Sequence, residues 1–410
     1  MVQIMRKMKD SGIEWIGEIP EGWEVLAHKY IMHKEKSICE HYSGEDVISL
    51  TLNGVVKRDL ENPSGKMPTT FNGYQFVDPN DLLLCLFDID VTPRCVGLVK
   101  DYGVTSPAYS RFKIYSGFCN AYYNYLLRFI DDEKVFIHLS KNLRSSLTES
   151  DFGAIKTIVP PKAEQQRIAD YLDNRTFEID TLLSKARSSI EEYKKLKQAV
   201  ITQAVATQQC SHIKLKHLMN VIVDCPHETP TYSFTGNYYV IRTADQALAS
   251  LRRDEDMYRL DASEYKKRTR RLTLDKDDIV YGREGERWGL ACIVPESNKY
   301  CLGQRIMQFR CNTKFLYPKY AMYTLNSEPV YLQGVADTIG STSPHVNIST
   351  ICNYLLPVPA LTEQKEIADY LDAKCAEIDG LIAKKEQLVK ELERYKKSLI
   401  YEVVTGKRKV

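Results

Sequence analysis

Apolar residues recur at alternating steps of four and three in two long segments of the chain. The predicted seam positions are Leu172, Ile179, Leu183, Ile190, Tyr193 and Val200 in the first segment, and Leu371, Ile378, Ile382, Val389, Leu392 and Leu399 in the second. A period of about 3.5 residues, with charged residues between the apolar ones, is typical of helices that pair as a coiled coil. The pattern therefore predicts two long helices that use these residues as their seam.

The two segments are copies of one another. The sequence VPPKAEQQRIADYLDNRTFEID, which begins at Val159, returns as VPALTEQKEIADYLDAKCAEID at Val358, 199 residues later. Prolines precede both segments, where they end a strand and allow a helix to begin. Thr362 is the predicted N-cap of the second helix, and Gly406 is its predicted C-cap glycine. A match of this length indicates an internal duplication.

Two regions of mixed strand and helix pattern lie beside these helices, at residues 23–161 and 210–357. Both show the same landmarks in the same order, beginning with an aspartate-led apolar strand at Asp81 and at Asp278. The predicted fold class is α+β, with two similar mixed α/β domains separated by two long helices in a pseudo-twofold internal repeat. The predicted division is an N-terminal strap at 1–22, domains at 23–161 and 210–357, and helices at 162–209 and 358–410.

The composition is that of a folded chain with more than one domain. Its 410 residues exceed what one hydrophobic core usually serves, and 43% of them are hydrophobic. No stretch approaches the roughly 18 apolar residues of a membrane helix, and the N-terminal segment lacks the apolar core of a signal peptide, so we expect a cytoplasmic protein without a membrane partner. The 11 cysteines are scattered without C-x-x-C spacing, which favours reduced, buried thiols over a zinc site.

No constellation of residues in the sequence is typical of catalysis. P-loop, G-x-G-x-x-G, H-E-x-x-H and G-x-S-x-G motifs are absent, as is the Asn/Asp-Pro-Pro-aromatic motif of adenine methyltransferases. The few histidines, such as His28 and His227, are more often structural than catalytic at such positions. We therefore predict no catalytic residue, no metal ligand and no cofactor bound by this chain.

Basic residues gather in loops of the two domains, although the net charge is only +2. The run KKRTRR at 266–271 places five cations in six residues. Arginine can bond guanine bidentately, Asn and Gln can bond adenine, and Lys mostly holds phosphate. The candidate DNA-binding residues are Asn53, Lys57, Arg58, Lys66 and Arg94 in the first domain, and Arg242, Arg252, Arg253, Lys266, Lys267, Arg268, Arg270, Arg271, Arg283, Arg287 and Arg305 in the second. For any one of them, a solvated surface charge is the competing interpretation.

Taken together, these motifs resemble the specificity (S) subunit of type I restriction–modification systems. The resemblance is carried by SGIEWIGEIPEGWEV near the N-terminus, by the paired EQ-x-x-IADYLD helices, by LTLNGVVKRDLENPSGK and LCLFDIDVTPR in the first domain, and by VDCPHETP, IRTADQ and CLGQRIMQFR in the second. It implies two target-recognition domains, each reading one half of a bipartite site on double-stranded DNA. It also implies that the long helices pack antiparallel as a coiled coil and set the spacing between the half-sites.

The resemblance further implies the partners of the chain. Two modification (M) subunits, which carry S-adenosylmethionine and methylate adenine, would bind around the helices, and restriction (R) subunits would bring ATP and magnesium. Phosphate contacts shared with the M subunits would account for the small net charge. The second domain begins with IKLKHLMN and has no counterpart of EWIGEIPEGW. A hypothesis for the strap is that it docks beside the C-terminal end of the second helix.

Two other interpretations of the sequence remain open. The helices alone would fit a structural or dimerising coiled-coil protein without DNA specificity. A self-contained methyltransferase or nuclease is the third interpretation, and the missing catalytic motifs count against it. The bases read and the spacer length depend on loop geometry that a single sequence does not specify.

Overall fold

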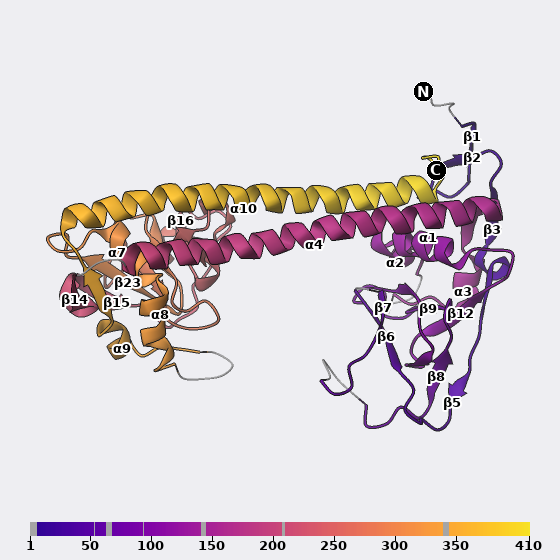
Figure 1. Ribbon diagram of the computed structural model, residues 1–410, viewed down its shortest axis with the longest axis horizontal. Coiled ribbons are helices and arrows are strands. Elements are labelled where there is room, and N and C mark those ends of the chain that lie inside the picture. The colour runs from indigo at the N-terminus through magenta and orange to yellow at the C-terminus, as the bar shows by residue number, and fades with distance from the viewer. Residues whose placement is uncertain are drawn as a thin grey trace. The chain divides into compact units, whose positions relative to one another are not determined.

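The chain folds into two compact units in the computed structural model (Figure 1). The structure describes residues 6–52, 54–62, 68–92, 94–140, 145–206, 210–338 and 344–410. Unit 1 comprises residues 1–185 and 388–410, and unit 2 comprises residues 186–387. Both division points fall inside the long helices, so each unit contains one end of each helix. The five-segment division predicted from the sequence, with boundaries at the helix ends, stays a prediction.

Two long helices are present where the apolar period predicts them. They are α4 (Lys162–Ala206) and α10 (Leu361–Val404). All of the predicted seam positions are buried or half-buried. Thr362 is not the N-cap of α10, because the helix already begins at Leu361 and the amide of Gln364 donates to the carbonyl of Ala360.

The long helices run antiparallel within each unit. In unit 1, Ile179 of α4 shares one hydrophobic core with Leu399 and Val403 near the end of α10. In unit 2, Val205 near the end of α4 shares a core with Leu371 near the start of α10. An early part of one helix therefore meets a late part of the other in both units, as the resemblance implied.

Unit 1 contains two main sheets and short helices, all linked to the first half of α4. The four-stranded sheet has the order β10 (Val96–Leu98), β9 (Leu82–Leu84), β12 (Ser110–Ile114), β4 (Met32–Lys34), and the five-stranded sheet the order β5 (Ile38–Cys39), β8 (Tyr74–Val77), β11 (Gly103–Thr105), β6 (Val47–Thr51), β7 (Gly54–Lys57). Two-stranded pairs are β1 (Met8–Asp10) with β2 (Glu18–Pro20), and β3 (Glu24–Ala27) with β13 (Lys156–Val159). The helices are η1 (His28–Tyr30), α1 (Asn120–Asp132), α2 (Val135–Leu139) and α3 (Glu149–Ala154).

Unit 2 repeats this plan. Its four-stranded sheet has the order β15 (Met219–Asp224), β23 (Ile306–Cys311), β20 (Ile279–Gly282), β21 (Ala291–Ile293), and its three-stranded sheet the order β19 (Arg259–Leu260), β16 (Tyr238–Ile241), β22 (Tyr300–Leu302). The pairs are β14 (Ser211–Lys214) with β24 (Leu355–Val358), and β17 (Gln246–Ala247) with β18 (Ser250–Leu251). The helices are α5 (Leu215–Leu218), η2 (Thr243–Asp245), η3 (Asp254–Asp256), α6 (Ala262–Arg268), α7 (Pro318–Leu325), α8 (Glu328–Val335) and α9 (Ile348–Cys352).

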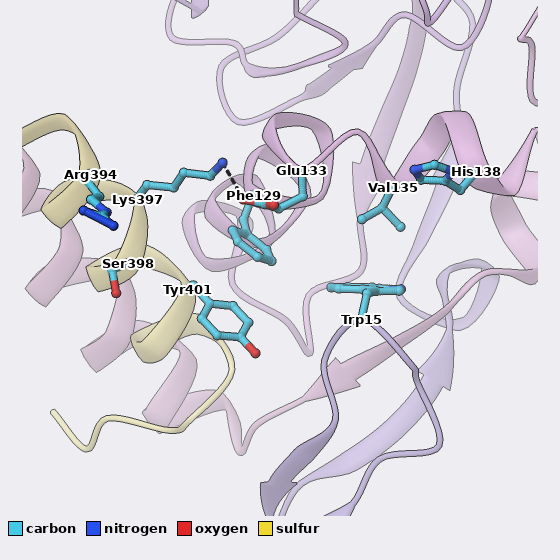
Figure 2. Close-up of a pocket in the computed structure, with 9 residues that line it drawn as sticks. All are labelled: Trp15, Phe129, Glu133, Val135, His138, Arg394, Lys397, Ser398 and Tyr401. Carbon is cyan, nitrogen blue, oxygen red and sulfur yellow. Dashed lines mark ion pairs between the residues drawn. The ribbon is translucent and has the colours of Figure 1, made fainter. Parts of the chain in front are cut away.

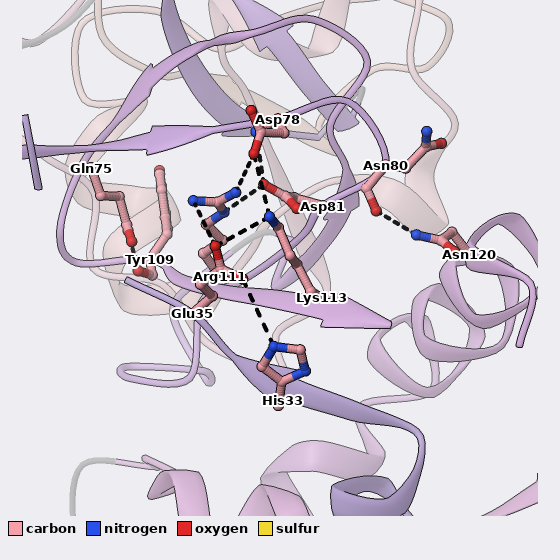
Figure 3. A network of polar contacts seen from close by, with 10 residues as sticks. All are labelled: His33, Glu35, Gln75, Asp78, Asn80, Asp81, Tyr109, Arg111, Lys113 and Asn120. Carbon is pink, nitrogen blue, oxygen red and sulfur yellow. Dashed lines mark hydrogen bonds and ion pairs between the residues drawn. The ribbon is translucent and has the colours of Figure 1, made fainter. Parts of the chain in front are cut away.

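The buried aspartate that begins the predicted apolar strand has the same role in both units. In unit 1, Asp81 accepts a 2.5 Å hydrogen bond from Nε of the buried Arg111 (Figure 3). In unit 2, Asp278 accepts from Gln308 at 2.7 Å and from Arg310 at 2.8 Å. A buried carboxylate is tolerated because donors surround it. The aspartate therefore ties adjacent strands of each four-stranded sheet together, and the two domains share a scaffold as predicted.

The repeated EQ motif joins each long helix to the domain before it. Gln165 accepts from the amide of Cys119 at 2.9 Å and donates to the carbonyl of Pro160 at 2.8 Å. Gln364 accepts from the amide of Tyr317 at 2.8 Å and donates to the carbonyl of Pro359 at 2.9 Å. Both glutamines are buried. The duplication thus preserves side chains that satisfy buried backbone groups at the start of each helix.

The aspartate of each YLD motif has an equally consistent partner. The hydroxyl of Tyr125 in α1 donates to Asp173 at 2.7 Å, and that of Tyr323 in α7 donates to Asp372 at 2.8 Å. α1 and α7 are therefore tyrosine-containing helices that bond to the long helix of their own unit.

The N-terminal strap lies beside the C-terminal end of α10 within unit 1 (Figure 1). The indole of Trp23 donates to Glu164 at 3.0 Å, and Lys407 donates to the carbonyl of Ile16 at 2.9 Å. Gly406 has a φ of +73°, and a Cβ there would lie 2.6 Å from Pro20 and 2.7 Å from Trp23. A glycine is required for both reasons. This geometry agrees with the docking hypothesis drawn from the sequence.

A pocket of about 530 Å³ opens in unit 1 between the strap, the α1–α2 region and α10 (Figure 2). Trp15, Phe129 and Tyr401 supply most of its apolar lining, and the rings of Phe129 and Tyr401 stack with centroids 5.0 Å apart. Three of its polar groups bond to neighbours: Lys397 pairs with Glu133 at 2.7 Å, and Ser398 donates to a glutamate of α10. The pocket therefore offers an apolar surface rather than a nucleophile activated by a base.

Two expectations about the whole chain can be compared with the structure. All 11 cysteines are free, and nine of them are buried, as scattered apolar positions predicted. Among the described residues, no helix combines the length and the apolar character needed to cross a bilayer.

Candidate nucleic-acid interface

The loops that follow four strands of unit 2, together with the end of α6 and the turn after it, form a surface that we call the basic surface. It consists of residues 224–228, 242–253, 266–271, 283–287 and 303–305. β15 and β20 both pair antiparallel with β23, so they point the same way and their last residues lie at the same edge of the sheet. β16 and β22 are parallel neighbours, so the loops that follow them also lie together. Recognition residues are commonly placed on such loops by a rigid scaffold.

Arg268, from the KKRTRR run, holds three of these segments together. Its guanidinium donates to the carbonyls of Leu302 at 3.0 Å, Glu228 at 3.0 Å and Gly303 at 3.3 Å. Only 2% of its side chain is exposed. Arg268 therefore joins segments of the basic surface, and its predicted DNA contact stays a prediction.

Arg283 has a similar internal role next to β15. Its Nε and Nη2 donate to the two carboxylate oxygens of Asp224 at 3.1 and 3.2 Å, and Nη2 also pairs with Glu284 at 2.6 Å. The amide of Arg283 donates to the carbonyl of Arg305 at 3.0 Å, which fixes the loop after β22 against the loop after β20. The predicted DNA contact of Arg283 thus falls on a buried guanidinium whose Nε and Nη2 are already paired.

The guanidinium of Arg242 forms a two-bond pair with the carboxylate of Asp245. Its Nε and its Nη2 each donate to one carboxylate oxygen at 2.9 Å. Its guanidinium carbon lies 3.8 Å from the ring centroid of Tyr258, and the bond to Asp245 raises the pKa of Arg242 above its usual value. Arg252 approaches the same carboxylate at 3.6 Å. Arg287 donates to the carbonyl of Gln246 at 3.2 Å and thereby joins this loop to the loop after β20.

The remaining candidates of unit 2 are exposed. They are Arg252, Arg253, Lys266, Lys267, Arg270, Arg271, Arg287 and Arg305. Part of this charge is balanced locally, because Arg253 pairs with Glu255 and Lys267 pairs with Glu228. Within the part of the chain that the structure describes, Lys266, Arg270, Arg271, Arg287 and Arg305 have no carboxylate within ion-pair distance. These five supply the uncompensated positive charge of the basic surface, which suits an anionic polymer.

The candidates of unit 1 are not brought together in the same way. Lys57 is exposed and pairs with Asp46 at 2.6 Å, and Arg58 is half-buried. Arg94 is 12% exposed, donates to the carbonyl of Leu52 at 3.1 Å and pairs with Asp132 at 3.2 Å. Asn53 and Lys66 lie outside the described residues. The DNA-binding assignments in both units stay predictions.

An aromatic group beside the basic surface is not among the candidates named from the sequence. The rings of Tyr232 and Tyr258 meet edge to face at 4.7 Å, both are exposed, and Arg242 covers Tyr258 from the other loop. Phe234 is fully exposed two residues after Tyr232. The segment TPTYSF gives one sequence signal for this group, because it carries aromatic residues among turn residues. Exposed aromatic and arginine side chains together are typical of binding surfaces.

Asp224, Cys225 and His227 form the one group among the described residues with the spacing of metal ligands. Two observations disfavour a metal there. The carboxylate of Asp224 is already bonded to Arg283, and to His227 at 3.0 Å. The guanidinium cation of Arg283 therefore occupies the carboxylate that a metal ion would need. Burial also raises the pKa of the Cys225 thiol, whereas a metal needs the thiolate. We therefore assign this trio to the architecture of the basic surface.

The molecule is thus a chain of two related domains, joined to paired antiparallel helices, with a basic loop surface on the second domain. Residues 213–391 match the family model Methylase_S, the type I restriction modification DNA specificity domain. The EcoBI specificity subunit of Escherichia coli is 30% identical over 137 residues, which are 32% of this chain and 27% of that protein. The MjaVIII specificity subunit of Methanocaldococcus jannaschii is 23% identical over 279 residues, 63% of each chain. The chain therefore spans about a quarter of the first relative and less than two thirds of the second.

Solved structures share the fold at low sequence identity. A chain from a study of complex assembly and conformational transition of the type I R-M system has a TM-score of 0.70 at 15% identity, covering 95% of this chain and 99% of that one. The HsdS subunit from Thermoanaerobacter tengcongensis has a TM-score of 0.51 at 16% identity, covering 95% and 98%. At these identities the structures speak for the fold alone. The sequence matches agree with the resemblance: the chain is similar to type I restriction specificity subunits, and its residues 213–391 match the model of their DNA specificity domain.

Proposed function

We propose that this chain is the non-catalytic DNA-recognition subunit of a type I restriction–modification complex, in which each domain reads one half of a bipartite target on double-stranded DNA. The observation that carries the proposal is a shared scaffold with dissimilar loops. The same buried aspartate, helix-start glutamine and strand order recur in both units, whereas the exposed arginines of the basic surface belong to unit 2. Two readers of different sequences need this combination of constant scaffold and variable loops.

The helices have two roles in this proposal. Each passes through both units, so we expect the pair to set the length of DNA between the half-sites. Their outer faces repeat as well: Leu182 and Leu196 are exposed, and so are their counterparts Leu381 and Tyr395, 199 residues later. A surface that occurs twice suits two copies of one partner, which we propose to be modification subunits. Restriction subunits would join this assembly in the cytoplasm.

No residue of this chain is assigned to a cofactor in the proposal. S-adenosylmethionine would be held by the modification subunits, and ATP with magnesium by the restriction subunits. The interpretation of the helices as a dimerising device is disfavoured, because their seams are filled from within the chain in both units.

The proposal is tested by DNA binding of the full chain, alone and with its modification subunit, over a range of salt concentrations. The variant Arg270→Glu/Arg271→Glu reverses two exposed charges of the basic surface. The matched control, Lys276→Glu/Lys314→Glu, reverses two exposed lysines near the opposite edge of the same sheet, before β20 and after β23. We expect the first variant to bind duplex DNA more weakly, with a shallower salt dependence, and the control to bind like the wild type. Equal affinities for all three proteins would contradict the proposal.

A further inference from the structure

Arg305 has a backbone conformation that arginine rarely adopts. Its φ is +67°, in the left-handed region, where a side chain with a Cβ is strained and glycine is not. The surrounding loops hold it there: its amide donates to the sulfur of Cys225 at 3.1 Å, and its carbonyl accepts from the amide of Arg283 at 3.0 Å. Strained residues of this kind persist where the surrounding structure imposes them, and they concentrate at functional sites.

The side chain of Arg305 is exposed on the basic surface. Two other arginines there are engaged: Arg242 is bonded by Asp245, and Arg283 by Asp224. Among the described residues no carboxylate pairs with Arg305. Its Nη1 lies 3.6 Å from the position that a Cβ on Gly285 would occupy, so the guanidinium extends over a turn without a side chain. The fork of Arg305 is therefore open to an incoming ligand.

The equivalent position in unit 1 carries a different residue. Arg111 lies opposite Leu83 in the β9–β12 pair, and Gln308 lies opposite Val280 in the β20–β23 pair, which aligns the two sheets with an offset of 197 residues. Arg305 then corresponds to Ala108, which is also exposed. The same point on the scaffold thus carries a guanidinium in one domain and a methyl group in the other.

From these three observations we propose that Arg305 is a specificity-determining residue, which reads a guanine in the half-site of unit 2 through the two donors of its fork. The inference rests on the proposed function and deepens it. Exposed lysines and arginines around it, such as Lys266 and Arg271, hold phosphates and contribute affinity without sequence information. Arg305 instead supplies the bidentate geometry that matches the O6 and N7 acceptors of guanine.

Two variants of Arg305 distinguish the contribution of its guanidinium group from that of its positive charge and from that of its backbone strain. Arg305→Lys keeps a positive charge but lacks the fork. Arg305→Gly removes the side chain and relieves the left-handed strain, so its thermal midpoint should equal or exceed that of the wild type. Lys134→Gly is the matched control, because Lys134 is also a long cation at positive φ, +56°, and lies in unit 1 away from the basic surface.

The probe is a pool of DNA duplexes with randomised sequence, from which the full chain with its modification subunit selects binders. We expect the wild type and Lys134→Gly to select guanine at one position of the half-site. At that position both Arg305 variants should prefer guanine roughly 10- to 100-fold less than the wild type does. The preferences at all other positions should be unchanged. An unchanged selected sequence, or a uniform loss of affinity for all sequences, would overturn the assignment of Arg305 and leave the proposed function intact. If the wild type selected no sequence at all, the proposed function itself would fail.

Discussion

Lys197 of α4 donates to both carboxylate oxygens of Asp379 of α10, at 2.9 and 2.8 Å, within unit 2. Within unit 1, Lys396 bonds both oxygens of Asp180, at 2.6 and 2.8 Å. Lys396 is the copy of Lys197, and Asp379 is the copy of Asp180, each 199 residues later in the chain. The two pairs are therefore the same contact made in the two opposite senses. Reciprocal pairs of this kind are expected of antiparallel copies related by a twofold axis, since a contact from i to j then implies one from j to i.

The two pairs differ in burial, which predicts different energies. The Lys197 side chain is 5% exposed and that of Lys396 is 25% exposed. Asp379→Asn leaves a buried ammonium without its carboxylate, and we expect it to lower the free energy of unfolding by about 1–2 kcal/mol. Asp180→Asn, the matched control, should cost less than about 1 kcal/mol. Urea unfolding of the full chain checks this order, and an equal or larger loss for Asp180→Asn would contradict it.

Within the KKRTRR run, we expect the buried Arg268 to contribute to stability and the exposed Arg270 and Arg271 to contribute to DNA binding. Arg268→Ala leaves three carbonyls of unit 2 without their donor, and we expect a loss of about 2–4 kcal/mol in stability. Arg270→Ala and Arg271→Ala change exposed side chains and should leave the thermal midpoint unchanged while weakening DNA binding. Thermal unfolding and binding measured on the same preparations test this division. A stable Arg268→Ala variant would show that the carbonyls do not depend on that side chain.

Unit 1 should lose stability in mild acid because of His28. This histidine is fully buried, and burial lowers its pKa from 6.5 to about 4, although it bonds the carbonyl of Phe152. Between pH 6.5 and 4 the unfolded chain therefore binds more protons, and stability falls as the pH falls. His28→Asn keeps a donor but does not titrate, so we expect the wild type to lose about 2 kcal/mol more than this variant between pH 6.5 and 5. A slope for His28→Asn that is identical to the wild-type slope would refute the assignment.

The docking of the strap should depend on Gly406. A methyl group at this position would contact Pro20 and Trp23 at less than 3 Å, and the φ of +73° adds strain. We expect Gly406→Ala to release the strap, which would appear as faster proteolysis within residues 1–22 and a change in Trp23 fluorescence. Gly380→Ala, at a position in α10 with open space, is the control and should change neither. A strap that stays protected in Gly406→Ala would contradict this account of the contact.

Periodicity and self-similarity were the parts of the sequence that predicted the fold best. The helices, their seam and the repeated landmarks follow from patterns extending over tens of residues, and the structure has them in place. Thr362 shows that the exact helix end was not predictable. The helix begins at Leu361, one residue before Thr362, because the carbonyl of Ala360 accepts the first hydrogen bond. Sequence patterns do not resolve helix ends to a single residue.

The binding residues were less predictable than the fold. A run such as KKRTRR identifies a basic segment, but Arg268 faces inward and Arg271 outward because α6 ends between them. From the sequence, Arg283 is interpreted as a surface cation. In the structure it bonds Asp224, which lies 59 positions earlier in the chain. Charge in a loop is visible in the sequence, whereas its burial and its partners depend on contacts between distant segments.

The central claim is that each domain reads its own half-site, and exchange of one domain tests it most directly. Residues 210–357 would be replaced by the corresponding domain of another specificity subunit, and adenine methylation would be mapped on single DNA molecules from cells that also contain the modification subunit. We predict that one half of the methylated site changes while the other half and the spacing between them stay the same. A change in both halves, or in neither, would contradict the claim.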